Sequence, residues 1–168
     1  FARLTERSPL SYLHASRRPW RGAFKLDGMI RELRGDLPAR FSDLERPFGV
    51  GVIDSGRVPW LLTEGHLPEA VAASCAIPRL FEPVQIHGRP WADGGIVDRT
   101  SLGTWRARRP GPVILHLIEA SSKGADPDPG DALVVRSPRS GAKLWSLGDA
   151  RARFERSRRL TAQALGSR

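Results

Sequence analysis

The chain has 168 residues, of which 40% are hydrophobic, and it carries a formal net charge of +9 at pH 7. This length suits one domain with a buried core, and the apolar fraction argues against a disordered protein. A mean hydropathy of −0.34, with no long uncharged apolar run, argues against a membrane-spanning helix. The single cysteine, Cys75, excludes an internal disulfide and is compatible with a reducing compartment.

The positive charge raises the question of a nucleic-acid partner. Nearly all the cations are arginines, spread along the chain with clusters at 17–18, 106–109 and 151–159. No zinc-ligand spacing, recognition helix or aromatic-basic RNA motif accompanies them, so we expect no specific nucleic acid. The simpler interpretation is a basic surface without a dedicated ligand. The functional alternative is attraction to anionic lipid headgroups, worth about 1 kcal/mol per surface cation. Because no long apolar run is present and the single cysteine is compatible with a reducing compartment, we expect a cytoplasmic protein, with peripheral membrane contact as the alternative.

The first half of the chain predicts two helices and two paired strands, preceded by short helix and loop over residues 1–25. The run 48–53 predicts a buried strand, and 58–62 predicts a second strand that pairs back after a turn at 54–56. A second helix begins at Leu67 or Pro68, since proline is tolerated in a first turn. The first helix is indicated by apolar residues on one helix face, before stops at Gly35 and Pro38: Leu26, Met29, Ile30 and Leu33.

The second half predicts an arginine- and proline-rich connection over 104–112 and the clearest buried strand of the sequence over 113–118. A loop rich in Asp, Pro and Gly follows at 121–131. The last segment, 148–165, predicts a helix with arginines facing water and four apolar residues placed to pack: Ala150, Phe154, Leu160 and Leu165.

The stretch 69–100 contains the most specific pattern. An apolar helix ends at Ala76-Ile77-Pro78, a proline-bounded elbow spans 78–83, and a β-type segment leads into Asp93-Gly94-Gly95. The glycines permit backbone angles and close approaches that other residues do not, so the carboxylate is expected at the tip of a tight turn. Asp-Gly is also an ordinary turn signal, so this tripeptide alone does not indicate a catalytic site.

In order, these segments resemble the C-terminal half of the patatin-like phospholipase domain, a family of lipid acyl hydrolases. The resemblance implies an α/β fold of three layers around a mostly parallel central sheet. We expect residues 1–168 to be the C-terminal portion of one such domain, with the core of the resemblance at 26–118 and a C-terminal helix at about 148–165. The matching residues are LDGMIREL at 26–33, AASCAIP at 72–78, LFEP at 80–83 and WADGGIVD at 91–98.

The resemblance also implies the chemistry. In this family a serine on a G-x-S-x-G elbow attacks the ester carbonyl, an aspartate of the DG[GA] motif takes the serine proton, and a glycine-rich loop supplies oxyanion donors. By resemblance Asp93 is the base, while Gly94 and Gly95 shape its turn. The implied substrate is a lipid or another acyl ester, and no cofactor or metal is implied.

The nucleophile is missing from the expected pattern, because no serine has glycine both two residues before and two residues after. Ser55, for example, has Ile53 two before, and Ser74 has Ala72. No glycine-rich oxyanion loop occurs either, and in family order both motifs precede Phe1. We therefore expect a C-terminal fragment that is inactive alone. The alternative is a catalytically inactive scaffold that binds anionic lipid or nucleic acid through its basic surface.

Other residues with chemical potential have simpler interpretations. Asp98 suits a capping or surface role better than a carboxylate pair with Asp93, and His87 suits a hairpin tip. Cys75 suits a small core residue, while Phe81 and Trp91 suit core packing or an acyl pocket. The family motif often continues toward Asn and Pro, whereas Asp98 is followed here by RTS at 99–101. The remaining histidines show no metal-ligand spacing: His14, His66 and His116.

Overall fold

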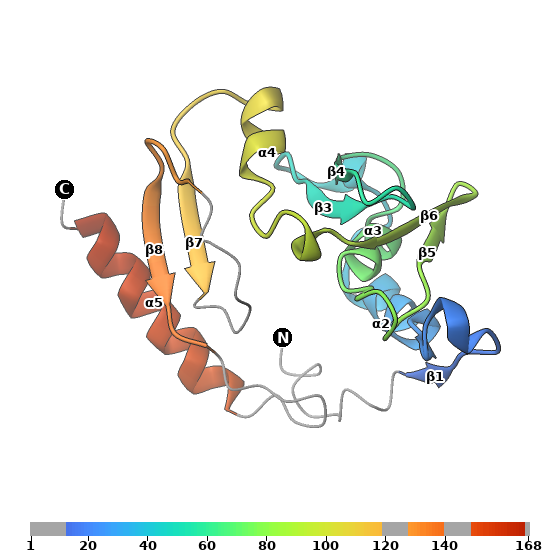
Figure 1. Ribbon diagram of the computed structural model, residues 1–168. Coiled ribbons are helices and arrows are strands. Elements are labelled where there is room, and N and C mark those ends of the chain that lie inside the picture. Colours follow the sequence, from blue (N-terminus) through green and yellow to red (C-terminus); the bar gives the residue numbers. More distant parts are fainter. Residues whose placement is uncertain (1–12, 119–127, 140–148, 167–168) are drawn as a thin grey trace. The chain divides into compact units, whose positions relative to one another are not determined.

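The computed structural model describes residues 13–118, 128–139 and 149–166 (Figure 1). They belong to two compact units. The first unit is Ser11–Pro110, and the described part of the second lies within Gly111–Arg168. The expectation that all 168 residues form part of one domain stays a prediction.

The first unit is built on a four-stranded sheet with the order β4-β3-β6-β5. Two hairpins make up this sheet, and β3 pairs with β6 to join them. Every neighbouring pair is antiparallel. The strands are β3 (Val50–Ile53), β4 (Pro59–Leu62), β5 (Val84–Ile86) and β6 (Arg89–Asp93).

Two helices pack with this sheet to form the core. Helix α3 (Leu67–Ala73) contacts β3, β5 and β6, and helix α2 (Asp27–Asp36) contacts α3 (Figure 1). The buried face of α3 is rich in alanine, whose small side chain lets a helix approach its neighbours closely. The most deeply buried residues of this unit, each at most 2% exposed, are Val52, Ile53, Leu67, Pro68, Ala70, Ala72, Ala73 and Ala76.

The elbow after α3 is held by a short strand from early in the chain. Strands β1 (His14–Ala15) and β2 (Phe24–Lys25) pair antiparallel, and Phe24 forms a parallel bridge with Phe81. The two phenylalanine rings lie 6.5 Å apart between centroids. The elbow that the prolines predicted is therefore fixed by backbone and ring contacts from outside its own sequence.

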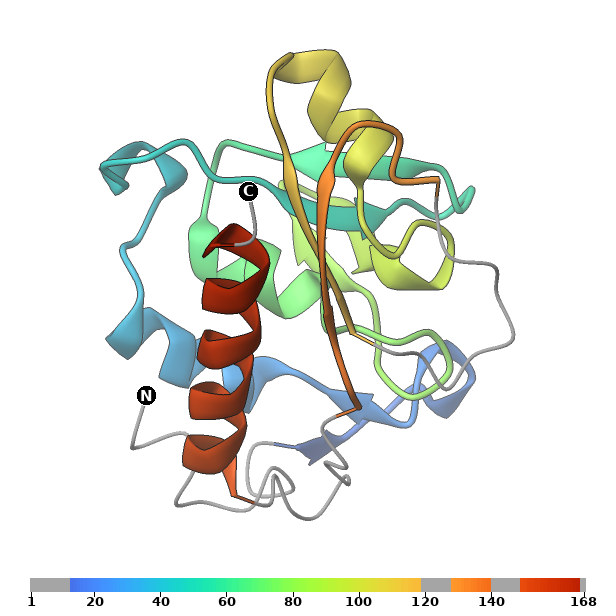
Figure 2. The ribbon, with the colours of Figure 1, turned by 90° about the vertical axis from the view of Figure 1, so that its left-hand side faces the viewer.

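The second unit contains a parallel strand pair and a long helix. Strands β7 (Ile114–Ile118) and β8 (Leu133–Ser137) lie side by side (Figure 2), and α5 (Ala150–Gly166) contacts β8. Burial alternates along β7, so Leu115 and Leu117 face the interior.

Within the described residues, no helix has the length and apolar character needed to cross a membrane.

The α/β class is confirmed, but the pairing of the first sheet differs from the mostly parallel arrangement that we expected. A two-residue turn at His87-Gly88 links β5 to β6, and residues 54–58 link β3 to β4. Such short links join antiparallel strands, because a parallel crossover needs a dozen or more residues. Parallel pairing occurs between β7 and β8.

Several local predictions are confirmed and others need correction. Helices α2, α3 and α5 and strands β3, β4 and β7 form where expected. The connection expected over 104–112 is instead helical as far as Arg108, as part of α4 (Leu102–Arg108). The first residue of this helix, Leu102, is buried, and the helix contacts β4. Strand β8 was not predicted. Four residues expected to be buried are exposed: Ile114, Ile118, Phe154 and Leu165.

Removal of two methyl groups from Val52 should destabilise the first unit. Val52 is 0% exposed in β3, so Val52→Ala should lower the free energy of unfolding by about 2 kcal/mol, including the cavity left behind. Val58→Ala is the matched control, because Val58 is 50% exposed and should change stability by less than about 0.5 kcal/mol. Urea unfolding measures both. Equal effects would contradict a core centred on β3.

Candidate active site

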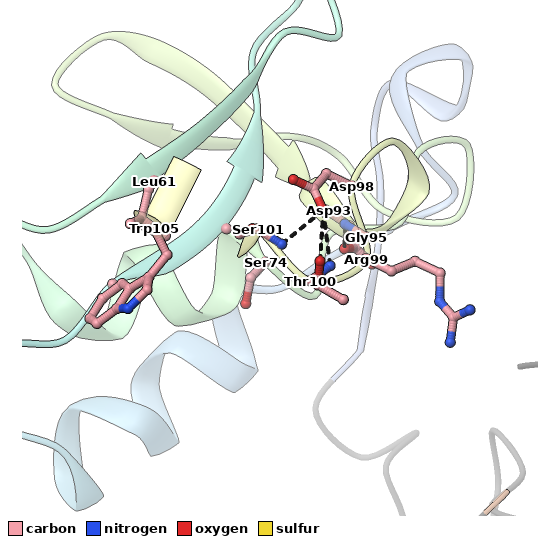
Figure 3. A pocket seen from close by; sticks show the side chains of 11 residues that line it. Leu61, Ser74, Asp93, Gly95, Asp98, Arg99, Thr100, Ser101 and Trp105 are labelled. Carbon is pink, nitrogen blue, oxygen red and sulfur yellow. Dashed lines mark hydrogen bonds between the residues drawn. The ribbon is translucent and has the colours of Figure 1, made fainter. Parts of the chain in front are cut away.

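A cavity of about 350 Å³ lies in the first unit, beside the end of β6. Asp93 and Asp98 stand at one side of it, and Leu61 and Trp105 lie together at another (Figure 3). The Arg99 side chain extends away from the other labelled residues (Figure 3). The cavity therefore combines carboxylates with an apolar wall. Its remaining lining residues are Gly49, Gly51, Ser74, Gly95, Thr100 and Ser101.

Asp93 is fixed by contacts on both its backbone and its side chain. It is the last residue of β6 and the N-cap of a 3-10 turn, η4 (Gly94–Ile96). Its backbone N–H donates to the carbonyl of Ala76 at 3.0 Å, and its Oδ1 accepts from the Gly95 N–H at 2.8 Å. The carboxylate thus sits at a tight turn, as the glycines predicted, while Ala76 ties that turn to the chain just after α3.

The two glycines after Asp93 each leave space that a side chain would fill. A Cβ on Gly94 would lie 2.8 Å from the backbone of Gly51 and Val52, so only glycine lets the turn rest on β3. A Cβ on Gly95 would lie 3.1 Å from Asp93 Oδ1 and would press on the carboxylate. Gly94 therefore positions the turn, and Gly95 leaves room for the side chain.

The environment of Asp93 makes its carboxylate more basic. Burial raises the pKa of Asp93 above its ordinary value, and the hydrogen bond from Gly95 only partly opposes this. Asp54, after β3, shows the opposite behaviour. Hydrogen bonds lower its pKa, chiefly the one from the Val58 N–H, with others from Trp60 and Gly56. Of these two turn aspartates, Asp93 is the better placed to accept a proton near neutral pH.

Asp98 organises the loop that leads from this turn to α4. Its Oδ1 accepts from the backbone N–H groups of Thr100 at 3.0 Å and Ser101 at 2.8 Å, and from the Thr100 hydroxyl at 3.3 Å (Figure 3). Ser101 adopts a left-handed backbone with φ of 50°, and its Oγ lies 2.3 Å from where a Cβ on Gly51 would stand. Asp98 thus orders the loop before α4 through a local turn and does not itself cap the helix, whose N-cap residue is Ser101.

Two serines, Ser74 and Ser101, line the cavity, although the sequence did not single them out as site residues. The Ser74 hydroxyl donates to the Val71 carbonyl at 2.8 Å. Within the described part of the chain, no serine hydroxyl forms a hydrogen bond with Asp93. One signal for the cavity was present in the sequence. Gly49 and Gly51 flank a strand residue, and glycine inside a strand marks a close approach by another segment.

The other candidate residues take varied positions. His87 occupies the tip of the β5–β6 hairpin with φ of 51°, as predicted. Phe81 and Trp91 are buried. Cys75 is exposed rather than part of the core, because α3 ends at Ala73 and Cys75 falls in the turn that follows. Over residues 13–118, 128–139 and 149–166, no three His, Cys, Asp or Glu side chains gather as a metal site.

Comparison with known proteins finds a family match for part of the sequence. The sequence model described as patatin-like phospholipase matches residues 34–103, which include the sheet of the first unit and the Asp93 turn. Over these residues the chain resembles the patatin-like phospholipase family. The resemblance read from the sequence is therefore confirmed, and the family is one of lipid hydrolases.

Three relatives of this patatin-like chain are described as uncharacterized NTE family proteins. One is from Mycobacterium bovis and two are from strains of Mycobacterium tuberculosis. Each is 29% identical over 140 residues, which is 80% of this chain. The match spans 38% of the length of each relative.

A side chain at Gly94 should push the Asp93 turn of this patatin-like chain away from β3. Gly94→Ala places a methyl group 2.8 Å from backbone atoms that cannot move aside easily, so we expect a loss of about 1–3 kcal/mol in urea unfolding. Gly103→Ala is the control. Nothing lies within 4 Å of its added Cβ, and alanine favours α4 by up to about 1 kcal/mol. Similar stability for both variants would contradict the close contact.

The raised pKa of Asp93 predicts a specific pH dependence. Because the folded chain holds this proton more tightly than the unfolded chain, Asp93 reduces stability as pH rises from the ordinary aspartate pKa through the raised one. Asp93→Asn removes that loss and keeps an oxygen for the Gly95 N–H. The variant should match the parent at about pH 3 and exceed its stability at about pH 7.

Asp54→Asn is the control of opposite sign. The pKa of Asp54 is lowered, so its charge stabilises the fold above the ordinary aspartate pKa and stops doing so as pH falls through the lowered pKa. That variant should be less stable than the parent near neutral pH and approach it in acid. Unfolding curves at several pH values measure both variants. The same trend in both would contradict the assigned environments.

Proposed function

We propose that this chain supplies the general base of a serine-dependent lipid acyl hydrolase, and that Asp93 is this base. The observation that carries the proposal is the carboxylate itself. It lies at a cavity, it is fixed by the Gly95 N–H, and burial raises its pKa. A base with a raised pKa accepts a proton more readily near neutral pH. The family match, which includes this turn, supports the same role.

The proposed reaction proceeds in two steps, acylation of the serine and hydrolysis of the acyl-serine. A serine hydroxyl attacks the ester carbonyl carbon while Asp93 takes the hydroxyl proton. The bond to the leaving alcohol then breaks, Asp93 returns the proton to the alkoxide, and an acyl-serine ester remains. Water attacks this ester, again with Asp93 as the proton acceptor. The serine recovers its proton, and a carboxylic acid is released.

The serine of this dyad is proposed to come from outside the 168 residues. None of the chain's serines has the glycine spacing of a nucleophile elbow, and among the described residues none donates to Asp93. The match to relatives over 38% of their length is compatible with this arrangement. The base and the nucleophile would then lie on separate parts of a longer chain.

The lining of the cavity supports an ester with an apolar portion. Leu61 is buried, and Trp105, four residues into α4, is half-buried beside it (Figure 3). Apolar side chains at this position can contact an acyl chain while the ester group faces Asp93. The apolar part of the cavity is limited to these two side chains, since most of the other lining residues are polar or charged.

The test is to measure turnover by the protein that the complete open reading frame containing this chain encodes. Asp93→Asn should lower kcat on a p-nitrophenyl acyl ester by roughly 10²–10⁴-fold, because a positioned base is lost. KM should change little, since the amide keeps the shape of the carboxylate. Circular dichroism should show an unchanged fold.

Asp128→Asn is the matched control for this loss of turnover. Asp128 also accepts a hydrogen bond from the glycine N–H two residues on, Gly130, at 2.9 Å, but it does not line the cavity. Its substitution should leave kcat unchanged. Full turnover in Asp93→Asn would remove the assignment of the base.

A further inference from the structure

A second and larger cavity, of about 780 Å³, lies in the same unit. It is an open groove bordered by β4, by the β5–β6 hairpin and by the loop before α3, and Asp93 does not line it. Its volume falls within the range of small-molecule sites. It has no part in the proposed hydrolysis.

One wall of the groove is aromatic. Trp91 is buried in β6, and Trp60 in β4 meets it edge to face, with ring centroids 6.0 Å apart and planes at 78°. Trp60 is 40% exposed, so part of its ring remains open to a ligand. The buried side chains of Phe41 and Ile86 extend this apolar surface. Such a wall can take up a hydrocarbon chain.

The groove also carries three arginines: Arg40, Arg89 and Arg108. The Arg89 guanidinium lies 5.8 Å from the centre of the Trp91 ring, and Arg108 donates to the Thr63 hydroxyl at 2.9 Å. These contacts orient the cations without neutralising them. In the part of the chain that the structure describes, no carboxylate forms an ion pair with any of the three.

The acidic groups around the groove do not balance this charge. Glu64 is the one carboxylate that lines it. Asp54 lies close enough for the charge of Arg89 to contribute to its lowered pKa, but its oxygens already accept from Val58, Gly56 and Trp60. Three guanidinium groups therefore face one lining carboxylate. The groove favours a ligand that carries negative charge.

Two histidines complete the polar side of the groove. The rings of His66 and His87 lie 6.0 Å apart between centroids, and both residues are exposed. His66 precedes α3 and His87 forms the hairpin tip, so the pair brings two separate loops to one edge. Imidazole nitrogens can donate to or accept from an oxygen-bearing headgroup.

We propose that this groove binds a single-chain anionic amphiphile, a molecule with a carboxylate or phosphate head and a hydrocarbon tail. The tail lies along Trp60 and Trp91, and the head lies among Arg40, Arg89 and Arg108. Arginine suits this head because its planar fork can donate two parallel hydrogen bonds to a carboxylate or phosphate. An anion without a hydrocarbon tail would leave the aromatic wall exposed to water. An uncharged lipid would leave the arginines without a negatively charged partner.

This site is independent of the proposed hydrolysis, since it contains neither Asp93 nor any residue of its turn. The two cavities nevertheless share Leu61 of β4. Fatty carboxylates, which ester hydrolysis releases, belong to the ligand class that the groove fits.

The experiment is isothermal titration of the 168-residue chain with dodecanoate and with dodecyl phosphate, each below its micelle concentration. Both should bind saturably with one molecule per chain. Arg89→Gln and Arg108→Gln should each weaken binding by about tenfold, the loss expected for one charge-assisted contact. Trp60→Ala should weaken it similarly through the tail. Asp93→Asn should leave binding unchanged, so this result is separate from the outcome for hydrolysis.

Arg109→Gln is the matched control, because it removes the same charge from the residue that directly follows Arg108. Arg109 does not line the groove. Its binding should stay within twofold of the parent. An equal loss in Arg109→Gln would show general charge attraction and overturn the proposal. Equal affinity for inorganic phosphate would show a site for the free anion, and equal affinity for dodecyl maltoside would show an apolar groove without charge selection. Capture by phosphatidylglycerol vesicles without dodecanoate binding would show a membrane surface. Each of these outcomes also overturns it.

Discussion

The close approach of Gly94 to the backbone of Gly51 and Val52 is the contact on which the first unit depends. It occurs where β3 and β6 pair, with Val52 opposite Asp93, and this pairing joins the two hairpins into one sheet. A side chain at Gly94 would separate the strands at their junction. The same contact determines where β6 ends, and so where the Asp93 carboxylate emerges. Sheet assembly and carboxylate placement thus have one physical cause.

Burial then decides the chemical character of that carboxylate. Asp54 follows β3 and Asp93 ends β6, and both accept from the N–H of a glycine two residues on. Asp54 also receives bonds from Val58 and Trp60, which favour its charged form. Asp93 receives fewer bonds and loses more solvent, which favours its protonated form. The Asp-x-Gly pattern alone does not distinguish them. The proposed role of Asp93 rests on its surroundings in the fold.

Local signals in the sequence predicted much of this structure. Helix-face spacing indicated α2, a turn between apolar runs indicated β3 and β4, and the glycines after Asp93 indicated its tight turn. Features that depend on distant residues were missed. Ser101 fills the space that Gly51 leaves, although fifty residues separate them. Helix α4 starts at the buried residue Leu102, and the antiparallel sheet depends on which hairpins meet. Such features follow from packing between distant segments, so the sequence of one segment does not predict them.

The Asp93 cavity and the groove that carries Arg40, Arg89 and Arg108 (the arginine groove) share three elements: β4, β6 and α4. Strand β4 supplies Trp60 to the arginine groove and Leu61 to both cavities, and β6 supplies Trp91 to one and Asp93 to the other. Helix α4 presents Trp105 to the Asp93 cavity and Arg108 to the groove, one turn apart. The contact of α4 with β4 therefore shapes both sites. This contact also places Arg108 in the groove, where it can bind an anion that has an apolar tail. The high arginine content alone could not indicate that position.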